Sequence, residues 1–339
     1  MSENESSVPF NSGVPVTGGQ SAHSTATVDY AALAPAARST WRGHLDLLDP
    51  VTWTAGPQAF ICGALASGGL AWDGRTLGLL LLGIALSGPL TIGFSQSIND
   101  FFDRDVDAVN EPTRPIPAGL VTPRGAVLNF SVVGLLALAV AVLLALLIGS
   151  PNGEWLVGMT VVGLALGVAY SAPPLAFKRN GLWGPLSVGL GYNLLTWLFG
   201  NLVFAPLKTE VVVLALVNAA IAAGLLILND LKSVEGDRAL GLRTAPVLYG
   251  VHGALLIAFT FINLSQLALM LFLFAGGHFW LGGLQLLALL AQISAQPALY
   301  KTPTHNQYKR YLLTGNGLIL LVALFSALAF GGYVPFNGW

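Results

Sequence analysis

The chain has 339 residues, of which 54% are hydrophobic and 9% charged, with a formal net charge of −1. Soluble domains carry about 25% charged residues, so this composition excludes a water-soluble globule and predicts an integral membrane protein. The near-neutral charge also excludes a general attraction to nucleic acid. Cys62 is the single cysteine and the five histidines are scattered, which excludes an intrachain disulfide and a zinc-type cluster.

The first forty residues are rich in Ser, Thr, Gly, Pro and Ala, and the first basic residue is Arg38. This composition argues against a secretory signal and against an Arg-rich transit peptide. It predicts a disordered tail at residues 1–40 and favours a bacterial protein. Residues 41–339 are expected to form a single transmembrane domain.

From residue 51 onward the chain divides into hydrophobic stretches near the roughly 20 residues that a helix needs to cross a bilayer. The alternating strands of a membrane barrel are missing from the pattern, so only helices fit. We predict an all-α bundle of about nine transmembrane helices, at residues 51–72, 77–98, 126–148, 155–172, 184–204, 211–228, 251–275, 279–299 and 312–333. Gly88 and Pro89 predict a bend in the second helix, which would open a lateral route into the bundle.

Basic residues are distributed unevenly between the two sides that these stretches define. Thirteen Lys and Arg fall in the N-terminal tail and in the loops after the second, fourth, sixth and eighth stretches, whereas only Arg75 and Lys208 fall on the other side. The positive-inside rule then predicts a cytoplasmic N-terminus, and an odd number of spans puts the C-terminus on the opposite side. The count of spans matters, because losing one span in the middle would separate the two acidic motifs described next.

Two carboxylate-rich segments repeat each other almost position for position, each at the cytoplasmic end of a hydrophobic stretch. They read Asn99-Asp100-x-x-Asp103-x-Asp105-x-Asp107 and Asn229-Asp230-x-x-Ser233-x-Glu235-x-Asp237. If each helix continues into its motif, Asp100, Asp103 and Asp107 share one helical face, and Asp230 and Asp237 repeat that face. The repeat predicts one acidic pocket, and it suggests two related halves of the chain.

Several carboxylates at a hydrocarbon boundary repel one another and are costly to desolvate, so the predicted pocket needs a compensating cation. Hard oxygen ligands suit Mg²⁺, which typically shares its coordination shell with substrate phosphates. A diphosphate carried on a lipid tail would lie naturally at this depth. The candidate catalytic and metal-binding residues are therefore Asp100, Asp103, Asp107, Asp230 and Asp237.

The alternative is that these segments are solvated helix ends. Asp100 would then pair with Arg104 at i+4, and Glu235 with Arg238 at i+3. Such a surface does not require an Asn-Asp start twice, at matching offsets, directly after a span. The pattern therefore favours the acidic pocket.

These residues resemble a known family. The segment from Asn99 to Asp107 resembles the first aspartate motif of the UbiA-type intramembrane prenyltransferases, and the segment from Asn229 to Asp237 resembles the second. Further strings resemble the chlorophyll and bacteriochlorophyll synthase branch: Asn110-Glu111-Pro112-Thr113-Arg114-Pro115-Ile116-Pro117, Tyr170-Ser171-Ala172-Pro173-Pro174, Lys178-Arg179-Asn180-Gly181 and Lys232-Ser233-Val234-Glu235-Gly236-Asp237-Arg238. The resemblance runs from about Trp41 to the C-terminus.

The resemblance implies that a geranylgeranyl or phytyl group is transferred from its diphosphate to the carboxylate of a chlorophyllide-type Mg-tetrapyrrole. Mg²⁺ held by the five aspartates would make the diphosphate a better leaving group. The pigment carboxylate is ionised near neutral pH, so no dedicated general base is required. The implied location is a bacterial cytoplasmic or photosynthetic membrane, and pigment-handling proteins are candidate partners.

Polar residues close to the motifs are candidates for binding the diphosphate or the pigment. Arg114 lies in a proline-stiffened loop, which suits a positioned guanidinium group, although it also fits a positive-inside topology signal. Lys178 and Arg179 allow the same two interpretations, and Tyr170 fits either a phosphate contact or an interfacial aromatic residue. The full candidate set is Asn99, Arg114, Tyr170, Lys178, Arg179, Asn229 and Lys232.

Some roles stay open at this point. Ser233 stands where many members of the superfamily have Asp, so it is expected to be a weak ligand or to hold a water molecule. Asp105 and Glu235 fall off the main face and fit either a supporting role or the helix surface. His44 and His252 could ligate pigment magnesium but are expected in loops.

Two other functions remain as alternatives. The same family could act on a quinone precursor or haem, which the pigment-branch strings disfavour. An ion-coupled transporter with inverted repeats would place its charged residues near the bilayer midplane, whereas every acidic residue here lies at a span end or in a loop.

Overall fold

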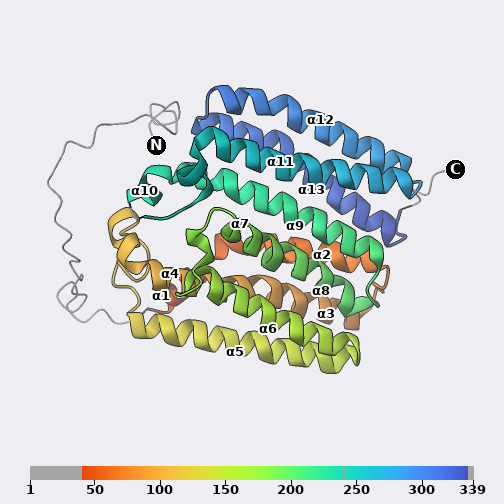
Figure 1. Ribbon diagram of the computed structural model, residues 1–339. Helices are drawn as coiled ribbons and strands as arrows, with labels where there is room; N and C mark the ends of the chain where they lie inside the picture. Colours follow the sequence, from red (N-terminus) through yellow and green to blue (C-terminus); the bar gives the residue numbers. More distant parts are fainter. Residues whose placement is uncertain (1–39, 240, 335–339) are drawn as a thin grey trace.

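The structure, a computed structural model, describes residues 40–239 and 241–334. These residues form helices that run side by side in one bundle, as Figure 1 shows. Within the described ranges there is no β-strand, and an isolated parallel bridge joins Asn180 to Arg243. The expected all-α class is confirmed. The predicted tail at residues 1–40 lies, apart from Thr40, outside the described residues.

The helices are short at the ends of the bundle and long across it. In chain order they are α1 Trp41–Asp46, η1 Pro50–Thr54, α2 Ala55–Ser67, α3 Gly74–Ala85, η2 Leu86–Leu90, α4 Thr91–Asn110, α5 Pro123–Ile148, α6 Asn152–Ser171, η3 Phe177–Arg179, α7 Trp183–Val188, η4 Gly189–Leu194, α8 Leu195–Phe204, α9 Thr209–Asn229, η5 Asp230–Lys232, α10 Val234–Ala239, α11 Ala245–Ala275, α12 Phe279–Lys301 and α13 His305–Phe330. The N-cap residues of α1, α3 and α5 are Thr40, Asp73 and Thr122. The side chain of each accepts a hydrogen bond from a backbone amide of the first turn.

Eight helical segments of the described chain are long and apolar enough to cross a membrane. They are Gly74–Ala108, Pro123–Ile148, Asn152–Ser171, Trp183–Phe204, Thr209–Lys232, Ala245–Ala275, Phe279–Lys301 and Asn306–Phe330. They match the second to ninth predicted spans, so the protein is a multi-pass membrane protein. The first predicted span is shorter than expected, because α2 has 13 residues. Counted together with η1 it would extend about 30 Å, close to the thickness of the hydrocarbon core.

The α2 helix packs closely against α8 inside the bundle. A Cβ atom on Gly63 would overlap the Trp197 carbonyl, and one on Gly200 would overlap the Phe60 carbonyl. Glycine on each helix therefore allows the two backbones to approach. Small residues of this kind are typical of helix contacts in membranes, where apolar burial alone does not favour association.

Two of the long spans contain a π-helical segment. Gly88 and Pro89, which predict a bend, lie in η2, and the Thr91 hydroxyl donates a hydrogen bond of 2.8 Å to the Leu86 carbonyl there. The Leu86 carbonyl also accepts the backbone N–H of Thr91, whereas Pro89 has no N–H to donate within the segment. The second segment, η4, interrupts the span of α7 and α8 and contains no proline. No sequence signal marks this second segment.

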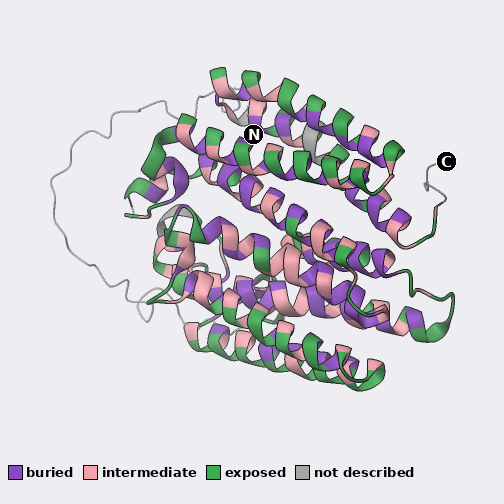
Figure 2. Ribbon diagram, turned by 45° about the vertical axis from the view of Figure 1, so that its right-hand side comes forward, coloured by how far each residue is buried: buried purple, intermediate pink, exposed green. Residues whose placement is uncertain are grey.

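The outward faces of the bundle expose large apolar side chains. Leu128, Leu135 and Leu146 on α5 are more than 60% exposed. Figure 2 shows this side of the molecule with exposed residues repeated along the outer helices and buried residues between them. A contiguous apolar surface of this kind fits contact with lipid chains.

Amide side chains join α11 and α12 within the bundle. Asn263 and Gln296 exchange two hydrogen bonds of 3.1 Å and 2.8 Å, and Gln285 donates to Gln266 at 3.1 Å. Polar pairs between membrane helices act as interhelical ties. They hold α12 in register with α11, the helix that directly follows the second acidic motif.

We expect a measurable coupling between Asn263 and Gln296. In a double-mutant cycle with Asn263→Leu and Gln296→Leu, the free energy of unfolding should show a coupling of about 0.6 kcal/mol and no more than about 1.7 kcal/mol. Denaturant titration of the purified protein in mixed micelles measures it. Strictly additive effects would contradict the reciprocal pair.

Candidate active site

Both acidic motifs lie at the same end of the bundle. The C-terminal end of α4 and the short helix α10 lie together on the left in Figure 1, while α13 ends at the opposite side. An even number of spans between the two motifs is needed to put them on the same side of the membrane. The structure has both motifs at one end of the bundle, as the predicted spans require.

The first motif is one continuous face of α4, as its spacing predicts. Asp100 and Asp107 are buried, with 5% and 8% of their surface exposed. The Arg114 guanidinium reaches back from the following loop, with its Nη1 atom 2.5 Å from Asp100 Oδ1 and its Nε atom 4.0 Å from Asp107 Oδ2. Glu111 holds the same Nε at 2.8 Å, a contact that the sequence analysis missed. Arg114 is thus positioned, as its proline-stiffened loop suggested.

Lys178 supplies the second cation of the first motif. Its Nζ atom lies 2.5 Å from Asp103 Oδ1, and only 11% of its side chain is exposed. Asn99 donates a hydrogen bond of 3.0 Å to the other oxygen of Asp103, and it also donates to Ser171 at 3.2 Å. Residues from α4, α6 and η3 therefore meet around Asp103.

The second motif differs from the first, because it is not one continuous helix. The α9 helix ends at Asn229, Asp230 begins the 3₁₀ segment η5, and Ser233 has non-helical dihedral angles before α10 starts. The expected i, i+7 face of Asp230 and Asp237 is therefore wrong in its geometry. The physical reason is that the Ser233 hydroxyl bonds its own local partners, a competition with helix pairing that is common for serine.

Asp237 is held by hydroxyl groups. It is buried and accepts hydrogen bonds from Ser233 at 3.1 Å and from Thr244 at 3.0 Å, both on Oδ2. Ser233 therefore supports Asp237 directly, which answers the open question about its role. Thr244 lies seven residues downstream and no sequence signal marked it.

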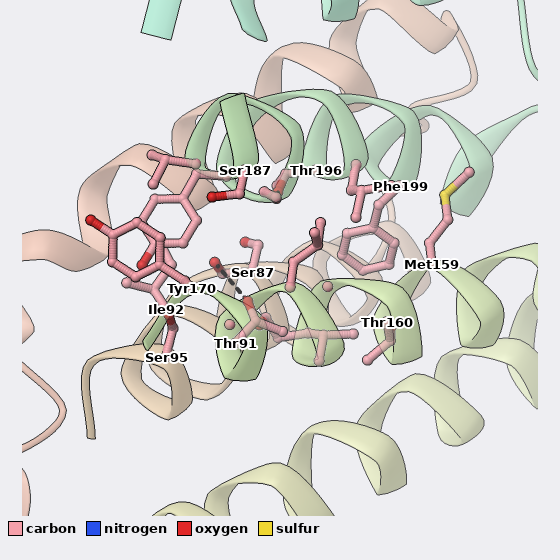
Figure 3. A pocket seen from close by; sticks show the side chains of 18 residues that line it. Ser87, Thr91, Ile92, Ser95, Met159, Thr160, Tyr170, Ser187, Thr196 and Phe199 are labelled. Carbon is pink, nitrogen blue, oxygen red and sulfur yellow. Dashed lines mark hydrogen bonds between the residues drawn. The ribbon is translucent and has the colours of Figure 1, made fainter. Parts of the chain in front are cut away.

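Tyr170 lies near both motifs. The charged groups within electrostatic range of its phenol include Asp103 of the first motif and Asp230 and Asp237 of the second. Tyr170 also lies at one end of a pocket between the spans Gly74–Ala108, Asn152–Ser171 and Trp183–Phe204 (Figure 3). One end of this pocket therefore lies near the acidic motifs.

Asn229 and Lys232 lie together beside the second motif. Lys232 Nζ is 2.8 Å from Asn229 Oδ1 and 4.8 Å from the ring centroid of Tyr308, which donates to the same Asn229 oxygen at 3.4 Å. Tyr308 comes from α13 and was not a sequence candidate. It brings the last long helix to the site.

Other candidates point away from the carboxylates. Arg179 is exposed, and Asp105 and Glu235 have 60% and 63% of their side chains exposed, so these two lie on the helix surface. Glu235 pairs with Arg238 at 3.5 Å as the solvated alternative expected, but Arg104 lies 3.9 Å from Asp105 instead of pairing with Asp100. His44 and His252 lie in helices α1 and α11, not in loops.

The charged groups outside the spans have shifted pKa values. Burial lowers the pKa of the Lys178 ammonium, and Asp103 only partly opposes this. Burial also acts against the charged form of Arg114, but Glu111, Asp100 and Asp107 outweigh it and raise the pKa of Arg114. Burial raises the pKa of Asp237, against the hydrogen bonds from Thr244 and Ser233. A bound anion would stabilise the poorly solvated Lys178 charge.

The carboxylates fit a divalent cation by their chemistry. Within the described residues no three Asp, Glu, His or Cys side chains lie close enough to form a ready metal cluster. However, Asp107 Oδ2 is buried and has no hydrogen-bond partner among the described residues. Arg114 and Lys178 pair with Asp100 and Asp103. A metal ion would satisfy oxygen atoms that these two cations leave without a partner.

The fold and site define an integral membrane enzyme class with a carboxylate-rich centre beside an apolar pocket. The UbiA prenyltransferase family model matches residues 57–318. The chain therefore belongs to the UbiA prenyltransferase family, and it is a prenyltransferase.

Three relatives carry the names of bacteriochlorophyll or chlorophyll synthases. The chain is 36% identical over 274 residues to the bacteriochlorophyll synthase 34 kDa chain of Chloroflexus aurantiacus, covering 80% of this chain and 86% of the relative. It is 36% identical over 313 residues to the bacteriochlorophyll synthase 33 kDa chain of Rhodobacter capsulatus, covering 89% and 98%. It is 40% identical over 242 residues to the chloroplastic chlorophyll synthase of Arabidopsis thaliana, covering 70% and 61%.

Solved structures share the fold. A structure of digeranylgeranylglyceryl phosphate synthase has a TM-score of 0.67 at 22% identity, covering 85% of this chain and 98% of that one. A UbiA homologue from Archaeoglobus fulgidus, bound to DMAPP and Mg²⁺, has a TM-score of 0.64 at 22% identity, covering 86% and 100%.

Removing the Arg114 guanidinium should destabilise the protein. Arg114→Met leaves the buried Asp100 carboxylate without its ion pair, so the free energy of unfolding should fall by about 1–3 kcal/mol. Adding Asp100→Asn should recover part of that loss. The matched control Arg124→Met, at an exposed position on α5, should change it by less than about 0.5 kcal/mol. Equal effects of Arg114→Met and Arg124→Met would contradict the ion pair.

Proposed function

We propose that this prenyltransferase esterifies the carboxylate of a chlorophyllide-type Mg-tetrapyrrole with a geranylgeranyl or phytyl group from the prenyl diphosphate. The observation that carries the reaction is that both acidic motifs lie at one end of the bundle, near the end of an apolar pocket that Tyr170 lines. The relatives named as bacteriochlorophyll and chlorophyll synthases support the choice of acceptor.

The pocket at Tyr170 suits a hydrocarbon chain although several of its residues carry hydroxyl groups. Thr91, Thr160, Ser187 and Thr196 each donate to a backbone carbonyl of their own helical segment, at 2.8 to 3.2 Å. Their hydrogen-bonding capacity is used within the helix, so the pocket presents mainly methyl and methylene groups. The prenyl tail would lie here, with its diphosphate at the acidic end.

The candidate metal ligands are Asp100, Asp103, Asp107, Asp230 and Asp237, which would hold Mg²⁺. Bound Mg²⁺ neutralises diphosphate charge and so makes it a better leaving group. Arg114 and Lys178 now pair with Asp100 and Asp103, close enough to bind phosphate oxygens in their place. Tyr170 can donate its hydroxyl to the same anion. Asn99 keeps Asp103 oriented.

In the proposed reaction, bonds break and form only between groups of the two substrates. The bond between the first prenyl carbon and the diphosphate oxygen breaks, and its electron pair leaves with the diphosphate. A carboxylate oxygen of the pigment donates an electron pair to the same carbon and forms the ester. The pigment carboxylate is already ionised near neutral pH, so no protein base is needed.

The acidic end of the bundle would face the cytoplasm. Thirteen of the fifteen Lys and Arg residues belong to that side on the counting given above, and the two motifs share one end in Figure 1. A bacterial cytoplasmic or photosynthetic membrane fits this arrangement. Pigment-handling proteins are candidate partners that would deliver the acceptor.

Membranes that contain the protein should form esterified pigment when given chlorophyllide or bacteriochlorophyllide, geranylgeranyl diphosphate and Mg²⁺. Asp100→Asn, Asp107→Asn and Asp237→Asn should each lower the rate by about a hundredfold or more, because each removes charge stabilisation at the leaving group. Chromatography of the extracted pigment measures the product.

The motifs offer matched controls for this assay. Asp105→Asn and Glu235→Gln remove carboxylates of the same two segments, but these side chains are exposed and should leave the rate within about twofold. No product with either pigment, together with prenylation of a quinone precursor or haem, would replace the proposed acceptor. Equal losses in the buried and exposed variants would count against the proposed site.

A further inference from the structure

The pocket at Tyr170 has two distinct ends. Figure 3 shows Tyr170 and Ser95 at one end, and Met159 and Phe199 at the other. Tyr170 and Met159 are both on α6, eleven residues apart, which corresponds to about 16 Å of helix. A chain with its diphosphate near Tyr170 would therefore extend along α6 toward Phe199.

The middle of the pocket is kept open by glycine. A Cβ atom on Gly163 would meet one atom within 4 Å, Leu195 Cδ1, at 3.9 Å, and Gly163 lies between Met159 and Tyr170 on α6. A larger side chain at this position would enter the pocket partway along its length. The two π-helical segments also line this pocket, through Ser87 of η2 and Gly191 of η4.

The far end of the pocket is held rigidly. Phe199 is 6% exposed and packs on Phe60, with 5.1 Å between the ring centroids. Phe60 is fully buried and lies against Gly83, where a Cβ atom would overlap its ring. The absence of a side chain at Gly83 thus makes room for Phe60, and Phe60 prevents Phe199 from turning away from the pocket.

We propose that Phe199, braced by Phe60, is the end wall that sets the longest prenyl chain the enzyme accepts. The inference rests on the proposed function in one respect, that the tail of the prenyl diphosphate occupies this pocket. Phe199 is a specificity-determining residue in this arrangement and takes no part in the chemistry at the acidic end. A larger side chain at Gly163 would shorten the same pocket.

Equilibrium binding of prenyl diphosphates to the purified protein tests the end wall without any acceptor. The series is geranyl, farnesyl, geranylgeranyl and geranylfarnesyl diphosphate, with Mg²⁺ present. For Phe199→Ala, the ratio of the Kd for geranylfarnesyl to that for geranylgeranyl diphosphate should fall by about tenfold or more, because the added isoprene unit becomes buried. Phe199→Leu should give an intermediate change.

Shortening the pocket gives the opposite test. Gly163→Leu should weaken geranylgeranyl diphosphate binding by about tenfold or more and leave geranyl diphosphate binding within about twofold. The matched control is Phe259→Ala, which removes a buried phenylalanine that packs on Tyr311 outside this pocket. It is expected to lower the stability of the protein without changing the ratio of the Kd values for the different prenyl diphosphates.

The outcomes separate the inference from the proposed function. If Phe199→Ala changes the Kd of all donors equally, or changes none, Phe199 is not the end wall. That result would indicate that the tail leaves the pocket sideways toward lipid. Loss of geranyl and geranylgeranyl diphosphate binding together in Gly163→Leu would also overturn the end wall. If the expected ratios appear but the parent protein forms no esterified pigment, the end wall stands and the proposed acceptor fails.

Discussion

The structure depends on placing several aspartates where a membrane-embedded helix meets water. Asp100 and Asp107 are almost completely buried, and a buried carboxylate is tolerable only when a cation or hydrogen-bond donors compensate it. Arg114 compensates Asp100, and Lys178 pairs with Asp103. Ser233 and Thr244 donate hydrogen bonds to Asp237 in the same way. The loops at the acidic end are therefore held in place by the charges that they neutralise, and the site and the fold at this end cannot be separated.

Inside the bundle the corresponding constraint is that every backbone group needs a partner. The π-helical segments η2 and η4 interrupt regular α-helical pairing in two spans, and the Thr91 and Thr196 hydroxyls donate to carbonyls of these segments. The same hydroxyls line the pocket at Tyr170, so these hydrogen bonds satisfy hydroxyl groups that would otherwise make the pocket polar. Glycines at helix contacts then decide how closely the neighbouring spans approach.

The sequence predicted the fold class and the first motif, because residue spacing along a continuous helix defines which side chains share a face. The predicted number of spans, about nine, is close to the eight long spans of the described residues. The sequence prediction misplaced Asp230 and Asp237 relative to one another, since Ser233 ends the regular helix and spacing no longer defines geometry. Partners such as Ser171, Thr244 and Tyr308 could not be predicted, because each approaches from a segment distant in sequence or across a loop. The η4 segment was missed because no proline marks it.

The pairing of Arg114 and Lys178 with the first motif has a consequence for how ligands bind. Because Asp100 and Asp103 already pair with Arg114 and Lys178, the proposed metal ion and diphosphate would bind by exchange. The carboxylates would hold Mg²⁺, and the released guanidinium and ammonium groups would bind the phosphates. Either ligand alone would leave one set of charges without a partner, so their binding free energies would be positively coupled, and by linkage each would raise the affinity for the other by the same factor.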